Sequence, residues 1–163
     1  MQGIDKYRRL YKAIGYTFTN EALLEQALTH RSAAKQHNER LEFLGDAILG
    51  MIVGETLFKR FPTVPEGKLT RMRSTLVKGD TLAELAKEAS VGELLNLGPG
   101  ELKSGGHRRS SILADAVEAI LGAIYLDSGM DEVRGVIDRL WETRINKLDP
   151  NAHPKDSKTR LQE

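Results

Sequence analysis

Acidic residues interrupt one of the most apolar segments of this chain. In NERLEFLGDAILG, residues 38–50, the acids Glu39, Glu42 and Asp46 are spaced i, i+3 and i+7, so one face of a helix would carry all three. Glu42 and Asp46 would stand one turn apart, roughly 6 Å along the helix axis. Because burying an ionised carboxylate costs on the order of several kcal/mol unless it is paired, these acids require partners from elsewhere in the chain.

A second apolar segment carries acids at a matching offset. Asp115 and Glu118 are spaced i and i+3 in SILADAVEAILGAIYL, residues 111–126. Lysine and arginine are scarce within both segments, whereas a divalent cation would compensate the clustered carboxylates. Hard oxygen ligands suit Mg²⁺, with Mn²⁺ as a substitute. The predicted metal ligands are therefore Glu42, Asp46, Asp115 and Glu118.

Small residues would allow these two segments to meet closely. Glycine inside a helix costs about 1 kcal/mol relative to alanine, so its repeated use suggests a close approach of backbones. Two helices packed through such residues would gather the acids at one cavity. The small residues are Gly45, Gly50 and Gly54 in the first segment and Ala114, Ala119, Gly122 and Ala123 in the second.

Two other interpretations of the acids are open. In the first, the acids are partly exposed and pair with arginines from other segments, although four acids in two apolar segments argue against it. In the second, the segments belong to a di-iron carboxylate bundle, which requires Glu-x-x-His pairs. None of the histidines stands three residues after a glutamate, which disfavours this interpretation; they are His30, His37, His107 and His153.

An all-oxygen metal site beside basic side chains suits phosphodiester hydrolysis. Bound metal ions lower the pKa of water, orient the phosphate and stabilise charge on the attacking and leaving oxygens. Flanking lysine and arginine would hold a polyanionic backbone, although such groups are more often solvated surface. One basic group comprises Lys59, Arg60, Lys68, Arg71, Arg73 and Lys78, and the second comprises Lys103, His107, Arg108 and Arg109.

The composition is that of a soluble globular domain. The chain has 163 residues, of which 40% are hydrophobic and 29% are charged, and its net charge of +1 says little about partners. The absence of cysteine excludes disulfides and thiolate metal sites and suits a reducing cytoplasm, which is the expected location. No apolar run approaches the roughly 20 residues needed to cross a bilayer, so no membrane association is expected.

Helical spacing of apolar residues predicts an all-α fold, a multi-helix bundle around a long buried central helix at residues 38–60. No alternating strand pattern is present. The other helices are predicted over residues 4–14, 20–30, 66–78, 81–90, 111–127 and from 131 to near Asp149.

Turn and cap residues predict where these helices begin and end. Pro62 and Pro65 break the chain after the central helix. Asn20 and Asp80 are predicted N-caps, and Gly129 is a predicted C-cap. Residues 91–109, VGELLNLGPGELKSGGHRR, are predicted to form one long glycine-rich loop.

The segment NERLEFLGDAIL closely resembles the signature of ribonuclease III, a family of endonucleases specific for double-stranded RNA. LTHRS at 28–32, EGKLTRMRSTLV at 66–77 and RRSSILADAVEAILGAIYLDSG at 108–129 agree in order and spacing. Four motifs together are highly specific, and the resemblance covers about residues 5–148. It implies an all-helical ribonuclease III catalytic domain that works as a homodimer, with RNA in a valley between the subunits.

The resemblance also implies two regions in the chain. Residues 1–149 match the catalytic domain. Residues 150–163 are expected to be a polar linker followed by the first residues of a double-stranded-RNA-binding domain, because DSKTRLQE resembles the opening of that domain. The chain is therefore expected to be truncated and to lack most of the RNA affinity that such a domain supplies through A-form shape.

Residue roles follow from the same resemblance. The four predicted metal ligands match the Mg²⁺-binding acids of the family, and two of them, Asp46 and Glu118, match those named as catalytic. Glu39 and Glu66 match supporting acids. Expected RNA contacts are Asn38, Arg108 and Arg109, and the expected dimer contact is Phe43.

The function implied is Mg²⁺-dependent hydrolysis of double-stranded RNA to 5′-phosphate and 3′-hydroxyl ends, as in the processing of ribosomal and messenger RNA. The alternative, from a different functional class, is a non-catalytic RNA-binding or assembly module of the same fold. The presence of all the matching acids favours the enzyme.

Overall fold

The computed structural model describes residues 2–151, and for residues 2–5 it describes the backbone alone. The described part is all-α, as predicted, and it contains no β-strand beyond one isolated bridge between Thr29 and Asn96. No helix within it is long and apolar enough to cross a membrane. Most of the predicted linker, residues 152–163, lies outside the described residues.

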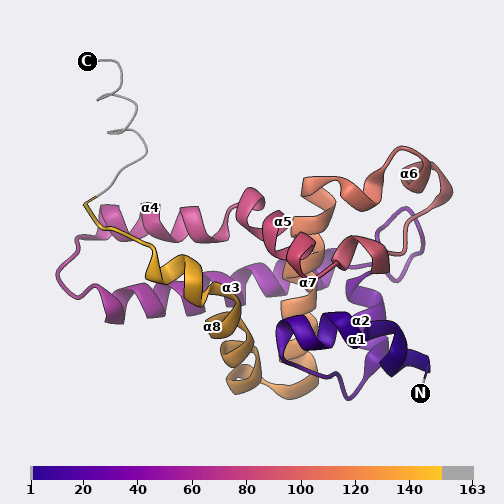
Figure 1. Cartoon of the computed structure of the whole chain (residues 1–163), viewed down its shortest axis with the longest axis horizontal. Helices are drawn as coiled ribbons and strands as arrows, with labels where there is room; N and C mark the ends of the chain where they lie inside the picture. Colours follow the sequence, from indigo (N-terminus) through magenta and orange to yellow (C-terminus); the bar gives the residue numbers. More distant parts are fainter. Residues whose placement is uncertain (1, 152–163) are drawn as a thin grey trace.

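Eight α-helices and two short 3₁₀ helices follow one another along the described chain (Figure 1). They are α1 (Gln2–Ile14), α2 (Glu21–Ala27), α3 (Glu39–Arg60), α4 (Glu66–Val77), α5 (Gly79–Glu88), η1 (Val91–Leu94), α6 (Pro99–Lys103), η2 (Gly106–Arg108), α7 (Ser110–Ser128) and α8 (Met130–Asn146).

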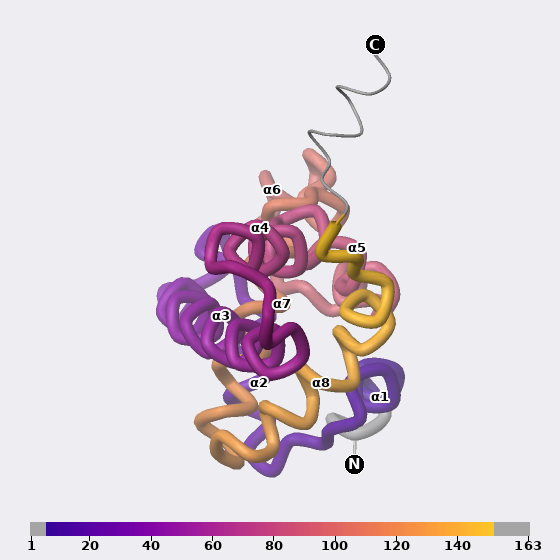
Figure 2. Tube along the Cα trace, turned by 90° about the vertical axis from the view of Figure 1, so that its left-hand side faces the viewer, coloured from indigo at the N-terminus to yellow at the C-terminus, as the bar shows by residue number. Residues whose placement is uncertain are grey.

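Helices α3 and α7 form the centre of the bundle. Figure 1 shows α7 crossing the long α3, with α4 running beside α3, and Figure 2 shows the same α3–α4 pair from the side. Helix α7 is buried almost all round, because nearly every residue from Ile112 to Ile124 is apolar or small. The predicted central helix is α3, which buries one side and leaves a second side open at Phe43 and Phe58.

The crossing of α3 and α7 depends on two glycines. A Cβ atom on Gly45 would lie 1.7 Å from the backbone oxygen of Glu118, and one on Gly122 would lie 2.4 Å from the backbone oxygen of Leu41. The close approach predicted for these two residues is therefore confirmed. It is wrong for Gly50, whose Cβ would meet nothing within 4 Å, and for Gly54, which faces only the side chain of Arg73.

The predicted caps are partly confirmed. The side chain of Asn20 accepts a hydrogen bond from the backbone of Ala22, and Gly129 ends α7 with a positive φ of 94°. Asp80 is not a cap, because α5 begins at Gly79 and Asp80 lies in its first turn. An acidic side chain there still complements the positive end of the helix.

The prediction of one long loop at residues 91–109 is wrong, since this segment folds into η1, α6 and η2. Pro99 stands at the first position of α6, where its fixed φ favours the start of a helix. The many glycines of this segment made that signal easy to overlook. Conversely, α2 ends at Ala27, earlier than predicted, because Leu28 and His30 bond instead to the backbone of Asn96.

Candidate metal centre

Three of the four predicted metal ligands lie together. One carboxylate oxygen from each of Glu42, Asp115 and Glu118 lies within 4.8 Å of the other two. Glu42 comes from the first turns of α3, and the other two come from α7, where the crossing at Gly45 brings the helices into contact. This spacing would let one divalent cation contact all three side chains, and carboxylate oxygens are ligands that Mg²⁺ accepts.

Burial and mutual repulsion raise the pKa values of these acids. Glu118 is only 9% exposed, and burial followed by a side-chain hydrogen bond with Asp46 raises its pKa to about 9. Burial and the charge of Asp115 raise the pKa of Glu42 to about 7, and burial also raises the pKa of Asp115. Without a cation the cluster therefore holds protons at neutral pH, and a bound cation would displace them.

Asp46 adjoins this group from a more exposed position. It lies one turn after Glu42 on α3 and interacts with Glu118, but it is not among the three carboxylates that share the 4.8 Å spacing. Among the described residues, none of the four acids forms an ion pair with lysine or arginine. The interpretation in which arginines neutralise these acids is thereby contradicted.

Glu39 and Glu66, the predicted supporting acids, lie in different places. Glu39 is paired with Arg31 at 3.6 Å, and its charge raises the pKa of Glu42 further, so it belongs to the surroundings of the cluster. Glu66 begins α4 and lines a hollow with Leu57 and Phe58. Since Leu57 follows Glu42 by fifteen residues of helix, Glu66 is about 20 Å from the cluster within one copy of the chain.

The predicted RNA contacts also differ from one another. Asn38 is 5% exposed, and its side-chain nitrogen donates to the backbone oxygen of Ala27 at 3.0 Å. Its side chain therefore holds the start of α3, and its expected contact with RNA stays a prediction. Arg109 is paired with Glu101 at 2.7 Å, whereas Arg108 is exposed and forms no ion pair within residues 2–151.

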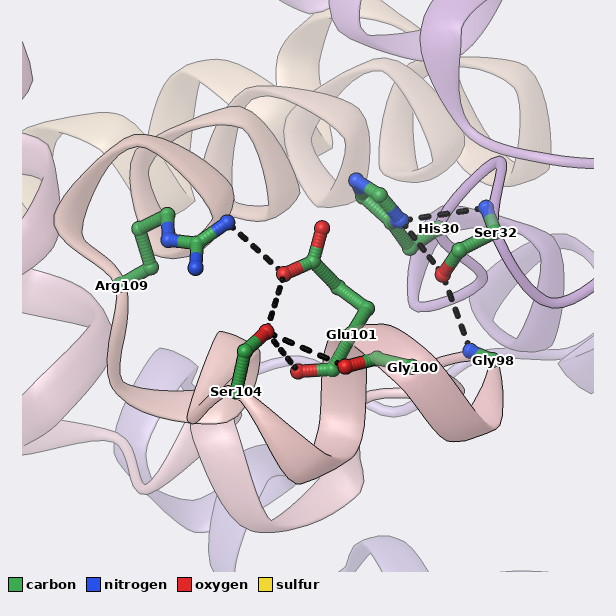
Figure 3. Close-up of polar contacts among 7 residues, drawn as sticks. All are labelled: His30, Ser32, Gly98, Gly100, Glu101, Ser104 and Arg109. Atoms are coloured by element: carbon green, nitrogen blue, oxygen red, sulfur yellow. Dashed lines mark hydrogen bonds and ion pairs between the residues drawn. The ribbon is translucent and has the colours of Figure 1, made fainter.

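Sequence reasoning missed a polar group that the structure places beside α7 (Figure 3). Glu101 accepts a hydrogen bond from Arg109, and the hydroxyl of Ser104 also donates one to it. In Figure 3, His30 and Ser32 lie on the side of Glu101 that faces away from Arg109. These residues come from α6 and its flanks on one side and from the segment between α2 and α3 on the other, which are far apart in the sequence. His30 and Ser32 belong to the LTHRS motif, which was noted only as part of the resemblance. The motif alone does not explain why a histidine and a serine stand at these two positions.

Metal-free stability provides a test of the raised pKa values. A carboxyl group in an unfolded chain has a pKa near about 4, so above that pH the folded state binds more protons than the unfolded state. The free energy of unfolding in EDTA should therefore fall as the pH rises through about 7 and towards about 9, the values for Glu42 and Glu118. Urea titrations at pH about 5, 7 and 9 measure it. Stability that increases between pH 7 and 9 would contradict the clustered arrangement.

The chain is similar to known proteins over most of its length. A family model described as Ribonuclease-III-like matches residues 20–144. Proteins named Ribonuclease 3 from Shewanella amazonensis, Photorhabdus laumondii and Aliivibrio fischeri are 58%, 59% and 61% identical to the chain. The matches cover 100%, 95% and 96% of the chain and 72%, 69% and 70% of the relatives' lengths.

Solved structures are similar as well. The nuclease domain of ribonuclease III from Campylobacter jejuni superposes with a TM-score of 0.82 at 40% identity, covering 87% of this chain and 97% of that one. A second structure of that domain, described for flexibility in a region involved in dimer formation, gives 0.81 at 40% identity, covering 85% and 97%. Dicer from Pichia stipitis gives 0.65 at 29% identity, covering 80% of this chain and 58% of that one.

Proposed function

Because the chain belongs to the ribonuclease III family, its activity is the hydrolysis of double-stranded RNA, and we propose that Glu42, Asp46, Asp115 and Glu118 support it by holding Mg²⁺. The observation that carries this proposal is the convergence of three carboxylates within 4.8 Å on two apolar helices. Among the described residues no basic side chain neutralises them, so a cation is the partner that their chemistry requires.

Each acid contributes to binding according to its position. Glu42, Asp115 and Glu118 would hold the ion, with Asp46 completing the site from its exposed position. Burial of Glu118 keeps its carboxylate away from competing water. Bound Mg²⁺ supplies an activated water and charge neutralisation at the phosphate. Mn²⁺, which accepts the same oxygen ligands, would substitute.

Incubation of the chain with a long RNA duplex tests the proposal. We expect cleavage with Mg²⁺ or Mn²⁺ to products with 5′-phosphate and 3′-hydroxyl ends, and no cleavage with EDTA. Single-stranded RNA of the same sequence is the control. A non-catalytic RNA-binding or assembly module would bind the duplex equally well with and without the ion and leave it intact, which would overturn the proposal.

We further propose that the chain acts as a homodimer through the open side of α3. Phe43, Met51 and Phe58 are 79%, 50% and 70% exposed at helical spacing, although large apolar side chains are usually covered. Gly50, between them, leaves room for a second backbone. The nuclease domain from Campylobacter jejuni is described as having a region involved in dimer formation, which supports a second copy as the partner here.

The two ends of this α3 surface are complementary. A hollow of about 240 Å³ lies at the Phe58 end, and Phe43 protrudes at the other end. A two-fold axis near Gly50 would place Phe43 of each copy at the hollow of the other copy, as an isologous interface requires. It would also bring Glu66, which lines the hollow, towards the acids of the other copy. The hollow is lined by Gly54, Leu57, Phe58, Glu66, Leu69, Thr70 and Arg73.

Replacing Phe43 by alanine should weaken this dimer. Loss of a large buried aromatic contact at an interface is expected to raise the dimer dissociation constant by about 30-fold or more. Analytical ultracentrifugation over a concentration series measures it. Leu126→Ala is the matched control, because Leu126 is also exposed, at 53%, but lies near the end of α7. Equal dissociation constants for the wild type and Phe43→Ala would contradict the proposed interface.

We propose RNA precursors, ribosomal and messenger, as substrates and the cytoplasm as the location. Residues 1–149 would form the catalytic domain, and residues 150–163 would be a linker with the first residues of a double-stranded-RNA-binding domain. The resemblance of the four sequence motifs supports these proposals. Arg108, exposed just before α7, is the proposed RNA contact, with Arg109 shared between RNA and Glu101.

A further inference from the structure

The ring of His30 is fixed in one tautomer. Its Nδ1 atom accepts a hydrogen bond from the backbone N–H of Ser32 at 3.1 Å and lies 2.8 Å from the Ser32 hydroxyl oxygen (Figure 3). A ring nitrogen that accepts carries no proton, so the proton of the neutral ring is on Nε2. His30 therefore presents an N–H donor in a defined direction.

The backbone around His30 holds that direction. The Ser32 hydroxyl oxygen accepts from the backbone N–H of Gly98 at 2.9 Å, which leaves its proton for His30. A Cβ atom on Gly98 would lie 2.3 Å from the backbone oxygen of Ser32, so the two loops are in direct contact. The backbone N–H of His30 also donates to Asn96 at 3.0 Å. These contacts hold the backbone of His30 and the hydroxyl of Ser32 in place, so the Nδ1 side of the ring faces Ser32.

His30 stands beside the acid cluster. Its neighbour Thr29 accepts from the backbone of Asn38 at 2.9 Å, and its other neighbour, Arg31, pairs with Glu39. Both contacts attach this loop to the first turn of α3, immediately before Glu42. The ring of His30 also belongs to the immediate electrostatic surroundings of Asp115.

The free nitrogen of His30 has no function within the described fold. No acceptor bonds to Nε2 among residues 2–151, and Figure 3 shows this atom pointing away from Ser32. A lysine or arginine here would pair with the acids and compete with a cation for them. A neutral imidazole can donate a hydrogen bond beside the same acids without that competition.

We propose that the Nε2–H group of His30 donates a hydrogen bond to a non-bridging oxygen of the RNA phosphate held at the acid cluster. This inference rests on the proposed function of that cluster. His30 is then a substrate-contacting residue that orients the phosphate and is not a metal ligand. The contact would add to the rate of cleavage and leave metal affinity unchanged.

Two substitutions separate this role from a structural one. His30→Asn places an oxygen acceptor near the position of Nδ1, so it preserves the Ser32 contact and removes the distal donor. His30→Gln places an N–H donor near the position of Nε2 and loses the Ser32 contact. A hydrogen bond to a charged oxygen corresponds to a loss of about 10- to 100-fold in single-turnover rate when it is removed. We expect this loss for His30→Asn and recovery of most of the rate for His30→Gln.

The assay is single-turnover cleavage of an RNA duplex with saturating Mg²⁺, beside Mn²⁺ calorimetry and thermal melting of each variant. The expected result is an asparagine variant that is slow, binds Mn²⁺ with wild-type affinity and melts at the wild-type temperature. A fast asparagine variant, or a glutamine variant slower than it, would overturn the role of Nε2. If the wild type cleaves and Glu118→Gln does not, such a result leaves the proposed function intact. Failure of the wild type to cleave would overturn both.

Discussion

Glu118→Gln is expected to lower the rate of RNA duplex cleavage by about 10³-fold or more, since it removes a charge from the centre of the acid cluster. Glu118 lies within 4.8 Å of Glu42 and Asp115 and is the most buried of the group. Glutamine has the same shape, so the crossing of α3 and α7 should persist. The cleavage rate at saturating Mg²⁺ is the primary measurement.

The same variant should keep or gain stability in the absence of metal. Burial raises the pKa of Glu118 to about 9, so ionising this side chain at high pH opposes folding. A neutral amide avoids that cost, and the fall of stability with pH should flatten in Glu118→Gln. Asp46→Asn should also lose cleavage. Glu142→Gln, on α8, is the control and should behave as the wild type. Full activity in Glu118→Gln would refute the assignment of the site.

Gly45→Ala is expected to destabilise the fold by about 3 kcal/mol or more, because the added methyl group has no space. The new Cβ atom would lie 1.7 Å from the backbone oxygen of Glu118 and 3.0 Å from the backbone nitrogen of Gly122. Backbone cannot move aside as a flexible side chain can, so α3 and α7 would have to separate. Glu42 would then withdraw from Asp115, and metal affinity should fall together with stability.

Urea unfolding followed by tryptophan fluorescence measures this effect, because Trp141, the single tryptophan, is fully buried. Gly67→Ala is the matched control. Gly67 lies in α4, where a Cβ atom meets nothing within 4 Å, so alanine there should raise stability by up to about 1 kcal/mol. An unchanged unfolding midpoint in Gly45→Ala would contradict the close crossing of the two helices.

The sequence predicted the helices well where local signals were strong. Apolar spacing located α3, α4 and α7 to within a residue or two, because long periodic segments leave few alternatives. It was less successful where short polar segments depend on distant contacts. Residues 91–109 carry glycines typical of a loop, yet the packing of Gly92 against His107 and of Gly106 against Glu101 stabilises short helices there.

The candidate site was predictable in its acids and not in its surroundings. Offsets along two helices indicated Glu42, Asp115 and Glu118, but a glycine list could not distinguish Gly45, at the crossing, from Gly50, in open space. That difference depends on which side of α3 meets α7. The tautomer of His30 was likewise invisible, because it depends on a loop contact that spacing does not encode.

Anomalous diffraction from crystals of the chain soaked in Mn²⁺ tests the central claim most directly. We expect a peak in contact with the carboxylates of Glu42, Asp115 and Glu118, and the loss of that peak in Glu118→Gln crystals. A chain that cleaves duplex RNA with Mn²⁺ while its only anomalous peak lies away from these three side chains would refute the proposed metal site.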